Sequence, residues 1–355
     1  MLVNYQNPHE ENTANHQKSA EQLFVNGPDF VLTDELASNW NRIARSAPQQ
    51  DPFSCTSDWQ VSFHEAFEPD RRVLVQQADD SLIQFAQYHR GAGRPVLAPI
   101  EKLWMFGSNA LGPHALDLLD DLIPKLPAHY SGQLPGFIFS ALEPAGSFYR
   151  ELRRRYDDQF KFSKFRSTVL CAAALEGGLD GFLSRRSANH RKKLRQNSRR
   201  AIEAGVLFER EIPSSEMQAE VIYDRMLAVE RASWKGYLWC GMDQPRPRKF
   251  YGALIRRLSV SKEARVIFTT HDGEDIGFIF GVMSGGIYRG QQFSYDVGWA
   301  NQSIGNLLQY EQVRWSCEEG GSRYDMGPLL GDRMEYKQHW TEEHVPIEAW
   351  LMDRQ

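Results

Sequence analysis

The segment Gln302-Ser303-Ile304-Gly305-Asn306-Leu307-Leu308 constrains the fold of this chain most, because of what stands on either side of it. Residues 286–296 before it are rich in aromatics and predict a strand, while the apolar residues after it recur at helical spacing. The sequence therefore predicts a strand, a polar turn and a helix whose first turn contains a glycine. The free N–H groups at such a helix start point outward, and the helix dipole favours an anion there. This segment predicts a place to hold phosphate.

Four further motifs occur in the same part of the chain. Gly320-Gly321-Ser322-Arg323-Tyr324-Asp325-Met326-Gly327 comes about a helix length after the turn, and Tyr336-Lys337-Gln338-His339-Trp340 follows it. Upstream, Phe182-Leu183-Ser184-Arg185-Arg186-Ser187 leads into a basic helix predicted over 189–204. Between them, Glu230-Arg231-Ala232-Ser233-Trp234-Lys235-Gly236 ends a helix predicted over 217–232.

This order of motifs resembles the C-terminal half of CelD/BcsL-type acetyltransferases, a GNAT branch associated with cellulose biosynthesis and related to the Fem-type peptidyltransferases. A D-x-G strand followed by YK-x-x-W is matched by Asp325 to Gly327 and by Tyr336 to Trp340. The GNAT pyrophosphate signature is matched at Gln302 and Gly305, although Leu307 stands where a small residue is expected. The resemblance covers residues 162–350. It implies an α/β (α+β) fold of tandem GNAT-like lobes, each a mixed, mostly antiparallel sheet flanked by helices.

The length of 355 residues favours two lobes, because one hydrophobic core rarely serves so long a chain. Residues 1–28 are polar at their start and predict a flexible N-terminal tail. We expect an N-terminal GNAT-like lobe over 29–160 and a C-terminal catalytic GNAT acyltransferase lobe over 161–355.

Composition narrows the possible functions. The net charge of −5 gives no overall nucleic-acid footprint, so no DNA partner is expected. No signal peptide and no apolar stretch of roughly 20 residues occurs, which predicts a cytoplasmic, bacterial-style protein without a membrane span. The four cysteines and ten histidines are dispersed without ligand spacing, so neither a metal nor a disulfide framework is expected.

The resemblance implies acetyl-CoA or another acyl-CoA as donor cosubstrate, with no tightly bound cofactor. The pyrophosphate is expected on the backbone amides of residues 303–307, and the pantetheine arm in a V-shaped gap between the strands that end near Ser284 and Asp296. The expected donor-binding residues are Tyr295, Gln302, Ser303, Ile304, Gly305, Asn306 and Leu307.

Five residues are candidates for the chemistry. Glu230 is the candidate general base for the attacking acceptor, with an exposed helix glutamate as the alternative. Tyr295 or Tyr336 is expected to protonate the leaving thiolate, unless each is a core aromatic. Asp325 is expected to orient Lys337 or the acceptor. Lys337 is expected to bind charge or stabilise the tetrahedral oxyanion, the alternative being a surface lysine.

Acceptor binding is expected at Trp234 and Lys235, whose alternative is a capped helix end with Gly236 in a left-handed turn. Arg191 and Arg195 share one face of the basic helix and predict binding of a CoA 3′-phosphate, a nucleotide-linked acceptor or tRNA. The alternative is a solvated helix face.

The sequence thus predicts an enzyme that transfers an acyl group to an amine or hydroxyl of a small-molecule, saccharide or peptide acceptor by direct attack. No nucleophile for a covalent intermediate stands out. Two alternatives stay open: a Fem-like transferase that uses aminoacyl-tRNA, and a non-catalytic GNAT-fold partner in exopolysaccharide assembly. The acceptor, the acyl chain length and the oligomeric state are not specified by these patterns.

Overall fold

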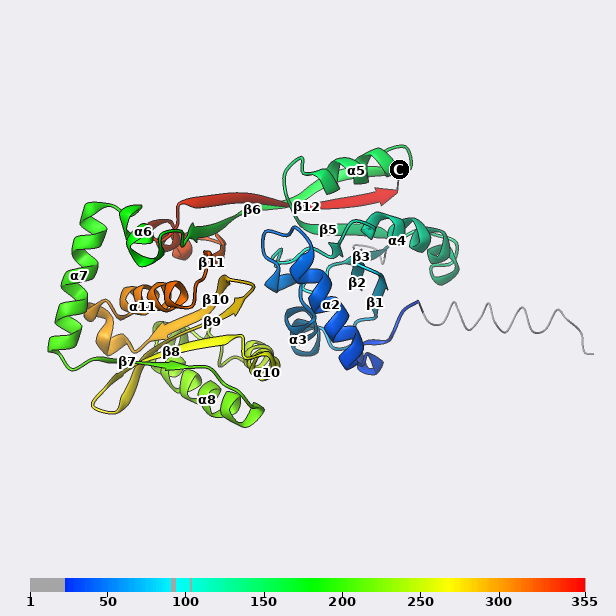
Figure 1. Cartoon of the computed structure of the whole chain (residues 1–355). Helices are drawn as coiled ribbons and strands as arrows, with labels where there is room; N and C mark the ends of the chain where they lie inside the picture. The colour runs from blue at the N-terminus through cyan, green and yellow to red at the C-terminus, as the bar shows by residue number, and fades with distance from the viewer. Residues whose placement is uncertain (1–22, 91–93, 103, 355) are drawn as a thin grey trace, which may run out of the picture. The chain divides into compact units, whose positions relative to one another are not determined.

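The computed structural model describes residues 23–90, 94–102 and 104–354, which divide into two compact units (Figure 1). Unit 1 holds the chain up to Gln49, then Glu68–Arg166 and the end from Ala349, while unit 2 holds Gln50–Phe67 and Ser167–Glu348. Two segments therefore depart from a simple N-to-C division. Gln50–Phe67 belongs to the later unit, and the C-terminal residues belong to the earlier one.

Unit 1 is a mixed sheet with helices. Its strands follow the order β1-β2-β3-β5-β12, with β4 paired to β2, and the described pairs are antiparallel except for the parallel pair of β3 and β5. The elements are η1 (Gly27–Asp29), α2 (Asp34–Ser46), β1 (Val73–Ala78), β2 (Ser81–Arg90), β3 (Arg94–Ala98), β4 (Ala110–Leu111), α4 (Ala115–Leu122), η3 (Ile123–His129), β5 (Gly136–Leu142) and α5 (Ser147–Tyr156). Two long strands, β6 (Phe160–Ala174) and β12 (Glu343–Arg354), contribute residues to both units.

The residues just before η1 are part of unit 1. Phe24 is buried in its core, and Val25 exchanges backbone hydrogen bonds with Val73 at 2.8 and 2.9 Å. The flexible tail expected over 1–28 otherwise falls on residues 1–22, which lie outside the described residues. An aromatic cluster that includes Phe85 and Phe139 fills the centre of this core.

Unit 2 contains the predicted strand, turn and helix. The elements are η2 (Phe53–Cys55), α3 (Ser57–Phe67), α6 (Gly178–Ser184), α7 (Ala188–Glu203), β7 (Leu207–Glu211), α8 (Glu216–Ala232), α9 (Trp234–Tyr237), α10 (Pro245–Ser261), β8 (Ala264–His271), β9 (Glu274–Ser284), β10 (Ile287–Tyr295), η4 (Val297–Gln302), α11 (Ile304–Glu318), β11 (Arg323–Pro328) and η5 (Asp332–His339). Its strands follow the order β6-β11-β10-β9-β8-β7. Among the described pairs, only β10 and β11 run parallel. The predicted mixed α/β fold, with mostly antiparallel sheets flanked by helices, is confirmed.

Strand β10 separates from β11 after a short stretch of pairing. The parallel pair joins only three residues of each strand and ends at Arg289 and Asp325, whereas β9 and β10 stay paired as far as Gly277 and Tyr295. The strands predicted to end near Ser284 and Asp296 are β9 and β10. The prediction of a gap between them is wrong, because they stay paired. The gap opens between β10 and β11. Beside it, β11 has a register shift between Asp325 and Gly327 in its pairing with β6, and Arg289 packs against Gly327.

Segment 50–67 is packed firmly into unit 2. The Trp59 ring meets Phe250 of α10 edge-on at 4.9 Å, and Phe63 meets the same ring at 6.4 Å. Arg257 of α10 donates to Ser62 at 2.9 Å and to Glu65 at 2.7 Å. Aromatic burial and these hydrogen bonds both stabilise the attachment, and ring pairs of this geometry add to the effect of the area they remove from water.

Candidate functional site

A cavity of about 600 Å³ lies in unit 2 where β10 leaves β11. This volume falls in the range of small-molecule sites. Strand β10, the start of α11, α9 and η5 all contribute to its wall. The lining residues are Trp234, Lys235 and Cys240; Ile279, Phe280 and residues 290–295; Ala300, Ser303, Gly305, Asn306 and Gln309; Tyr324 and Met326; and Met334, Tyr336, Lys337 and Trp340.

Helix α11 presents its N-terminus to this cavity. Ser303, in the left-handed conformation (φ 59°, ψ 30°), precedes the helix, and no side chain of the described residues caps it. The N–H groups of Asn306 and Leu307 already bond the Ser303 carbonyl at 3.0 and 3.1 Å. The pyrophosphate was expected on the backbone amides of residues 303–307. Of these, only the N–H groups of residues 303–305 are left to bind it.

The other residues expected around the donor divide between wall and core. Ser303, Gly305, Asn306 and Tyr295 line the cavity. Ile304 and Leu307 instead bury their side chains beneath it, and Gln302 is exposed without lining it. Gly305 is required by packing, because an added Cβ would lie 2.9 Å from Cε1 of Tyr295.

Tyr336 and Lys337 both face the cavity from η5. The Tyr336 hydroxyl makes no hydrogen bond with any residue that the structure describes, and burial raises the pKa of this phenol. The Lys337 ammonium donates to the carbonyl of Pro328 at 2.7 Å. Burial, and then the nearby Arg289 charge, lower the pKa of Lys337 to about 8. Lys337 is only 7% exposed, so the surface-lysine alternative is wrong.

Asp325 lies behind the cavity, where β10 and β11 separate. Its Oδ1 accepts the N–H of Gly327 at 2.6 Å and lies 3.7 Å from Nε of Arg289. That guanidinium bonds Asp51 at 2.7 Å and the Gly290 carbonyl at 2.6 Å. Burial raises the pKa of Asp325 to about 6. Asp325 was expected to contact the acceptor, but it does not line the cavity. Its side chain is instead held within this buried cluster.

Glu230 is fully buried behind the wall, so the exposed-glutamate alternative is wrong. Its Oε1 accepts the N–H of Met242 at 2.7 Å, and its Oε2 accepts the hydroxyl of Ser294, which lines the cavity. An added Cβ at Gly241 would lie 2.3 Å from Oε1, so only glycine lets the chain pass this carboxylate. Glu230 is not itself part of the cavity wall, and Ser294 stands between it and the cavity.

Lys235 and Trp234 are placed by Ser233, which ends α8 and begins α9. The Ser233 hydroxyl donates to the carbonyl of Glu230 at 2.7 Å and accepts the N–H of Lys235 at 3.2 Å. The Lys235 ammonium then bonds Gln292 Oε1 at 2.9 Å and the Phe293 carbonyl at 2.8 Å, and burial lowers its pKa. Both expected acceptor residues line the cavity.

Gly236 does not adopt the expected left-handed turn. It is absent from the positive-φ glycines of the described chain, and an added Cβ would lie 2.4 Å from the Arg231 carbonyl. Close approach of the backbone therefore accounts for this glycine.

The two arginines expected on the basic helix differ in their surroundings. Arg191 of α7 donates to the carbonyls of Leu183 and Arg186 at 3.3 and 2.6 Å, so its guanidinium holds the end of α6. Arg195 is exposed. Neither lines the cavity, although α7 lies beside η4.

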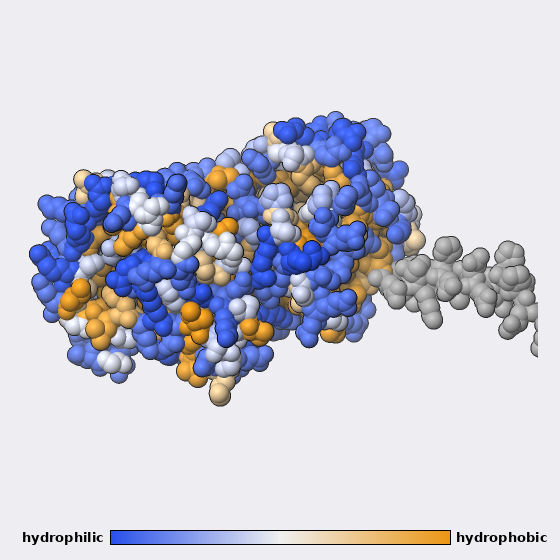
Figure 2. All heavy atoms as spheres, in the orientation of Figure 1, coloured by the Kyte–Doolittle hydropathy of each residue, from blue (hydrophilic) through white to orange (hydrophobic). Residues whose placement is uncertain are grey.

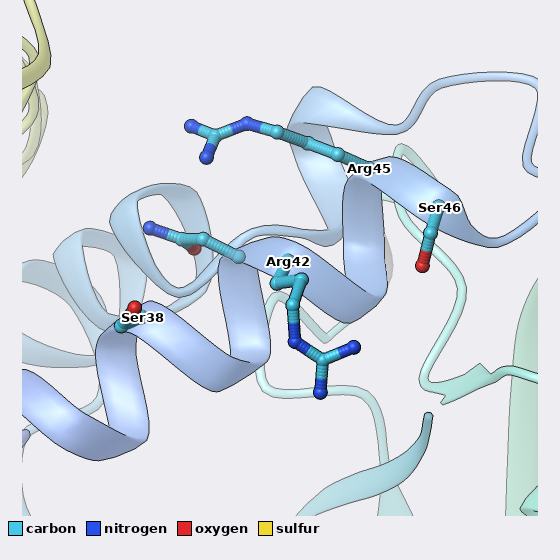
Figure 3. Close-up of a pocket in the computed structure, with 5 residues that line it drawn as sticks. Ser38, Arg42, Arg45 and Ser46 are labelled. Atoms are coloured by element: carbon cyan, nitrogen blue, oxygen red, sulfur yellow. The ribbon is translucent and has the colours of Figure 1, made fainter. Parts of the chain in front are cut away.

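Unit 1 has a separate concavity along α2, of about 510 Å³ (Figure 3). Figure 3 shows Arg42 and Arg45 extending from the helix in different directions, and Arg42 donates to the Asp79 carbonyl at 2.9 Å. The wall, Ser38, Asn41, Arg42, Arg45 and Ser46, contains no carboxylate or thiol among its described residues. By contrast, the cavity of unit 2 is lined by both titratable and aromatic side chains, so we take it as the candidate site. Across the described residues, no group of three or more His, Cys, Asp or Glu is placed to hold a metal ion.

Two residues of the site were not predicted from the sequence. Ser294 lies beside Tyr295 in the predicted strand, and the alternation of side chains along a strand is only a weak indication of which face it occupies. Nothing in the sequence indicates that Asp51 pairs with Arg289, because the two residues are 238 positions apart in the chain.

Comparisons with known proteins agree with this geometry. Residues 188–338, which contain most of the cavity wall, match the acetyltransferase (GNAT) domain family. Among curated proteins, none matches this sequence. The CelD/BcsL subtype therefore stays a prediction.

Solved structures share the fold over most of the chain. A conserved protein of unknown function from Bacteroides thetaiotaomicron is 11% identical, with TM-score 0.62, over 91% of this chain and 98% of that one. FemX is 10% identical, with TM-score 0.59, over 90% and 96%. The C-terminal domain of a putative lysylphosphatidylglycerol synthetase from Agrobacterium fabrum is 13% identical, with TM-score 0.54, over 90% and 92%. At these identities the likeness is one of fold.

Proposed function

We propose that unit 2 catalyses acyl transfer from acyl-CoA, most simply acetyl-CoA, to an amine or hydroxyl. One observation carries the proposal: the cavity runs from the separation of β10 and β11 to a helix N-terminus that no described side chain caps. Beyond Arg289 the backbone of β10 is not paired with β11. The carbonyls of Gly290 and Phe293 bond Arg289 and Lys235, so an extended pantetheine arm would bond the remaining backbone groups of this stretch. The start of α11 suits the pyrophosphate. The GNAT family match over residues 188–338 supports the same chemistry.

The proposed reaction is direct attack. The acceptor nitrogen or oxygen attacks the thioester carbon, the carbonyl oxygen becomes an oxyanion, and the carbon–sulfur bond then breaks. The Lys337 ammonium stabilises the oxyanion, because it is held at the cavity wall with its charge largely desolvated. Tyr336 donates its proton to the leaving thiolate, because this residue lines the cavity and its hydroxyl has no described hydrogen-bond partner.

The proton of the acceptor leaves through Ser294 and Glu230. Ser294 faces the cavity and donates its own hydroxyl hydrogen to Glu230. As the acceptor loses a proton to Ser294 Oγ, the serine hydrogen passes to the Glu230 carboxylate. Glu230 thus serves as the base through one intervening hydroxyl.

Calorimetric titration with acetyl-CoA tests the donor site. Asn306→Glu adds a carboxylate at the cavity end of α11, which repels the pyrophosphate but suits the helix dipole, so folding is preserved. Asn306→Gln has nearly the same shape without the charge. We expect micromolar binding in the wild type and the glutamine variant, and at least tenfold weaker binding in the glutamate variant. Equal binding by all three proteins would place the donor elsewhere.

Helix α7 supports a second candidate, an aminoacyl-tRNA donor. Its exposed cations are Lys192, Lys193, Arg195, Arg199 and Arg200. Among these, Arg199 alone has a described ion-pair partner, Glu203 at 3.7 Å. Binding of tRNA that weakens steeply with salt, together with no binding of acyl-CoA, would favour this donor.

A further inference from the structure

A strip of large apolar side chains stands exposed where α9 ends. We define this aromatic strip as Trp234, Tyr237, Leu238 and Trp239, which are 37, 66, 56 and 79% exposed. Side chains of this size are seldom so exposed in succession. The strip belongs to unit 2 and does not contribute to its core.

The backbone beneath the strip is fixed by hydrogen bonds. Leu238 N–H bonds the Trp234 carbonyl at 3.1 Å, Trp239 N–H bonds Gly236 at 3.1 Å, and Cys240 N–H bonds Lys235 at 3.0 Å. Trp239 adopts a left-handed conformation (φ 52°) that a bulky residue rarely takes. A defined turn therefore holds the strip outward.

The sequence around the strip is basic, although Lys235 is half-buried and Lys249 shares a surface concavity with Glu220 and Asp224 of α8. Residues 231–249 contain five cations and a single carboxylate, Asp243, while the whole chain carries −5. Asp243 is occupied by Arg231 at 2.9 Å and lies 3.6 Å from Arg248. Arg246 and Lys249, in the first turns of α10, are exposed and have no ion pair with a described residue.

The strip also adjoins the cavity. Trp234 of the strip lines the cavity wall, as do Lys235 and Cys240, which neighbour strip residues in the sequence. A surface bound by the strip would therefore lie beside the cavity that Ser294 also lines.

We propose that the aromatic strip docks onto an anionic lipid surface, with Leu238 and Trp239 entering the interface and Arg246 and Lys249 contacting headgroups. Tryptophan and tyrosine favour the membrane–water interface, and exposed basic residues are attracted to anionic lipids. No helix of the described chain is long and apolar enough to cross a bilayer. The docking is peripheral and brings the cavity to acceptors carried at the lipid surface, which goes beyond acyl transfer itself.

Vesicle flotation of the full chain tests the proposal without any acyl donor, so its outcome is separate from that of the proposed function. The vesicles are phosphatidylcholine with or without phosphatidylglycerol. The double variant Leu238→Ser/Trp239→Ser removes the apolar contact, and Arg246→Gln/Lys249→Gln removes charge. The matched control is Met217→Ser/Val221→Ser, which removes exposed apolar side chains of α8; Figure 2 shows apolar surface over the region of α8 and α10.

We expect the wild type and the α8 control to float with anionic vesicles. The strip variant should lose at least tenfold in partitioning, and the charge variant should lose its preference for phosphatidylglycerol. Absence of wild-type binding, or binding that the strip variant retains, would overturn the proposal. Binding of tRNA that the strip variant abolishes, without vesicle binding, would assign the strip to nucleic acid instead.

Discussion

Arg289 and Asp51 form a buried ion pair between positions 238 residues apart, with Nε and Oδ2 at 2.7 Å. Their side chains are 5% and 2% exposed. Asp51 also accepts the N–H and the hydroxyl of Ser54. The pair thus ties segment 50–67 to the place where β10 leaves β11.

Removing Asp51 should be strongly destabilising. Asp51→Ala leaves the Arg289 charge with Asp325 as its remaining carboxylate neighbour, and breaking a buried pair costs about 3–5 kcal/mol. Urea unfolding measures the loss. The more exposed pair of Arg231 and Asp243 is the control, since Asp243→Ala should change stability little. An equal, small change in both variants would contradict a structural role for the buried pair.

Glu230→Gln should separate proton transfer from folding. Glutamine can still accept from Met242 and donate to Ser294, so the fold and donor affinity should be kept, while loss of the base lowers kcat by about 100-fold or more. Thiol release from acetyl-CoA with an accepted amine measures the rate. Ser294→Ala should give a similar loss, because it removes the hydroxyl through which Glu230 acts. Full activity of Ser294→Ala would show that the proton leaves by another path.

Local patterns predicted much of the fold, because strand β10, helix α11 and the basic helix α7 are specified by their own sequences. The motif residues Trp234, Lys235, Tyr295, Tyr336 and Lys337 also come together at one cavity. What could not be predicted depends on long-range packing. The gap lies on the other side of β10, where Arg289 is buried against Gly327 and bonded to Asp51, a residue far away in the sequence.

The pH dependence of activity should report Lys337. Since its pKa in the folded protein is about 8, a role for the ammonium predicts activity that declines as pH rises through 8. Lys337→Arg keeps the charge and should move this decline to higher pH, while Lys337→Met should remove it. A rate that instead rises through pH 8 would make the neutral amine the active form.

Stability should change with pH in the opposite sense. The pKa of Lys337 falls from 10.5 to about 8 on folding, so between these values the unfolded chain binds more protons. The unfolding free energy should therefore rise with pH across this window, by up to about 3 kcal/mol at 1.36 kcal/mol per pKa unit. Lys337→Met lacks this contribution, so the difference between the two proteins isolates it. A difference that does not vary between pH 8 and 10 would contradict the lowered pKa.

Gly241→Ala should displace the Glu230 carboxylate while leaving that residue itself unchanged. The added methyl group would lie 2.3 Å from Glu230 Oε1 and 2.9 Å from Cδ, so the carboxylate or the 240–242 backbone must shift. Overpacking of this kind costs about 1–3 kcal/mol, and displacement of Glu230 should lower kcat together with stability. Gly136→Ala, whose methyl group meets its nearest atom at 3.4 Å, is the control and should leave both unchanged. Thermal unfolding and thiol-release assays measure the two effects. A Gly241→Ala protein with wild-type activity would show that catalysis does not depend on the position of the Glu230 carboxylate.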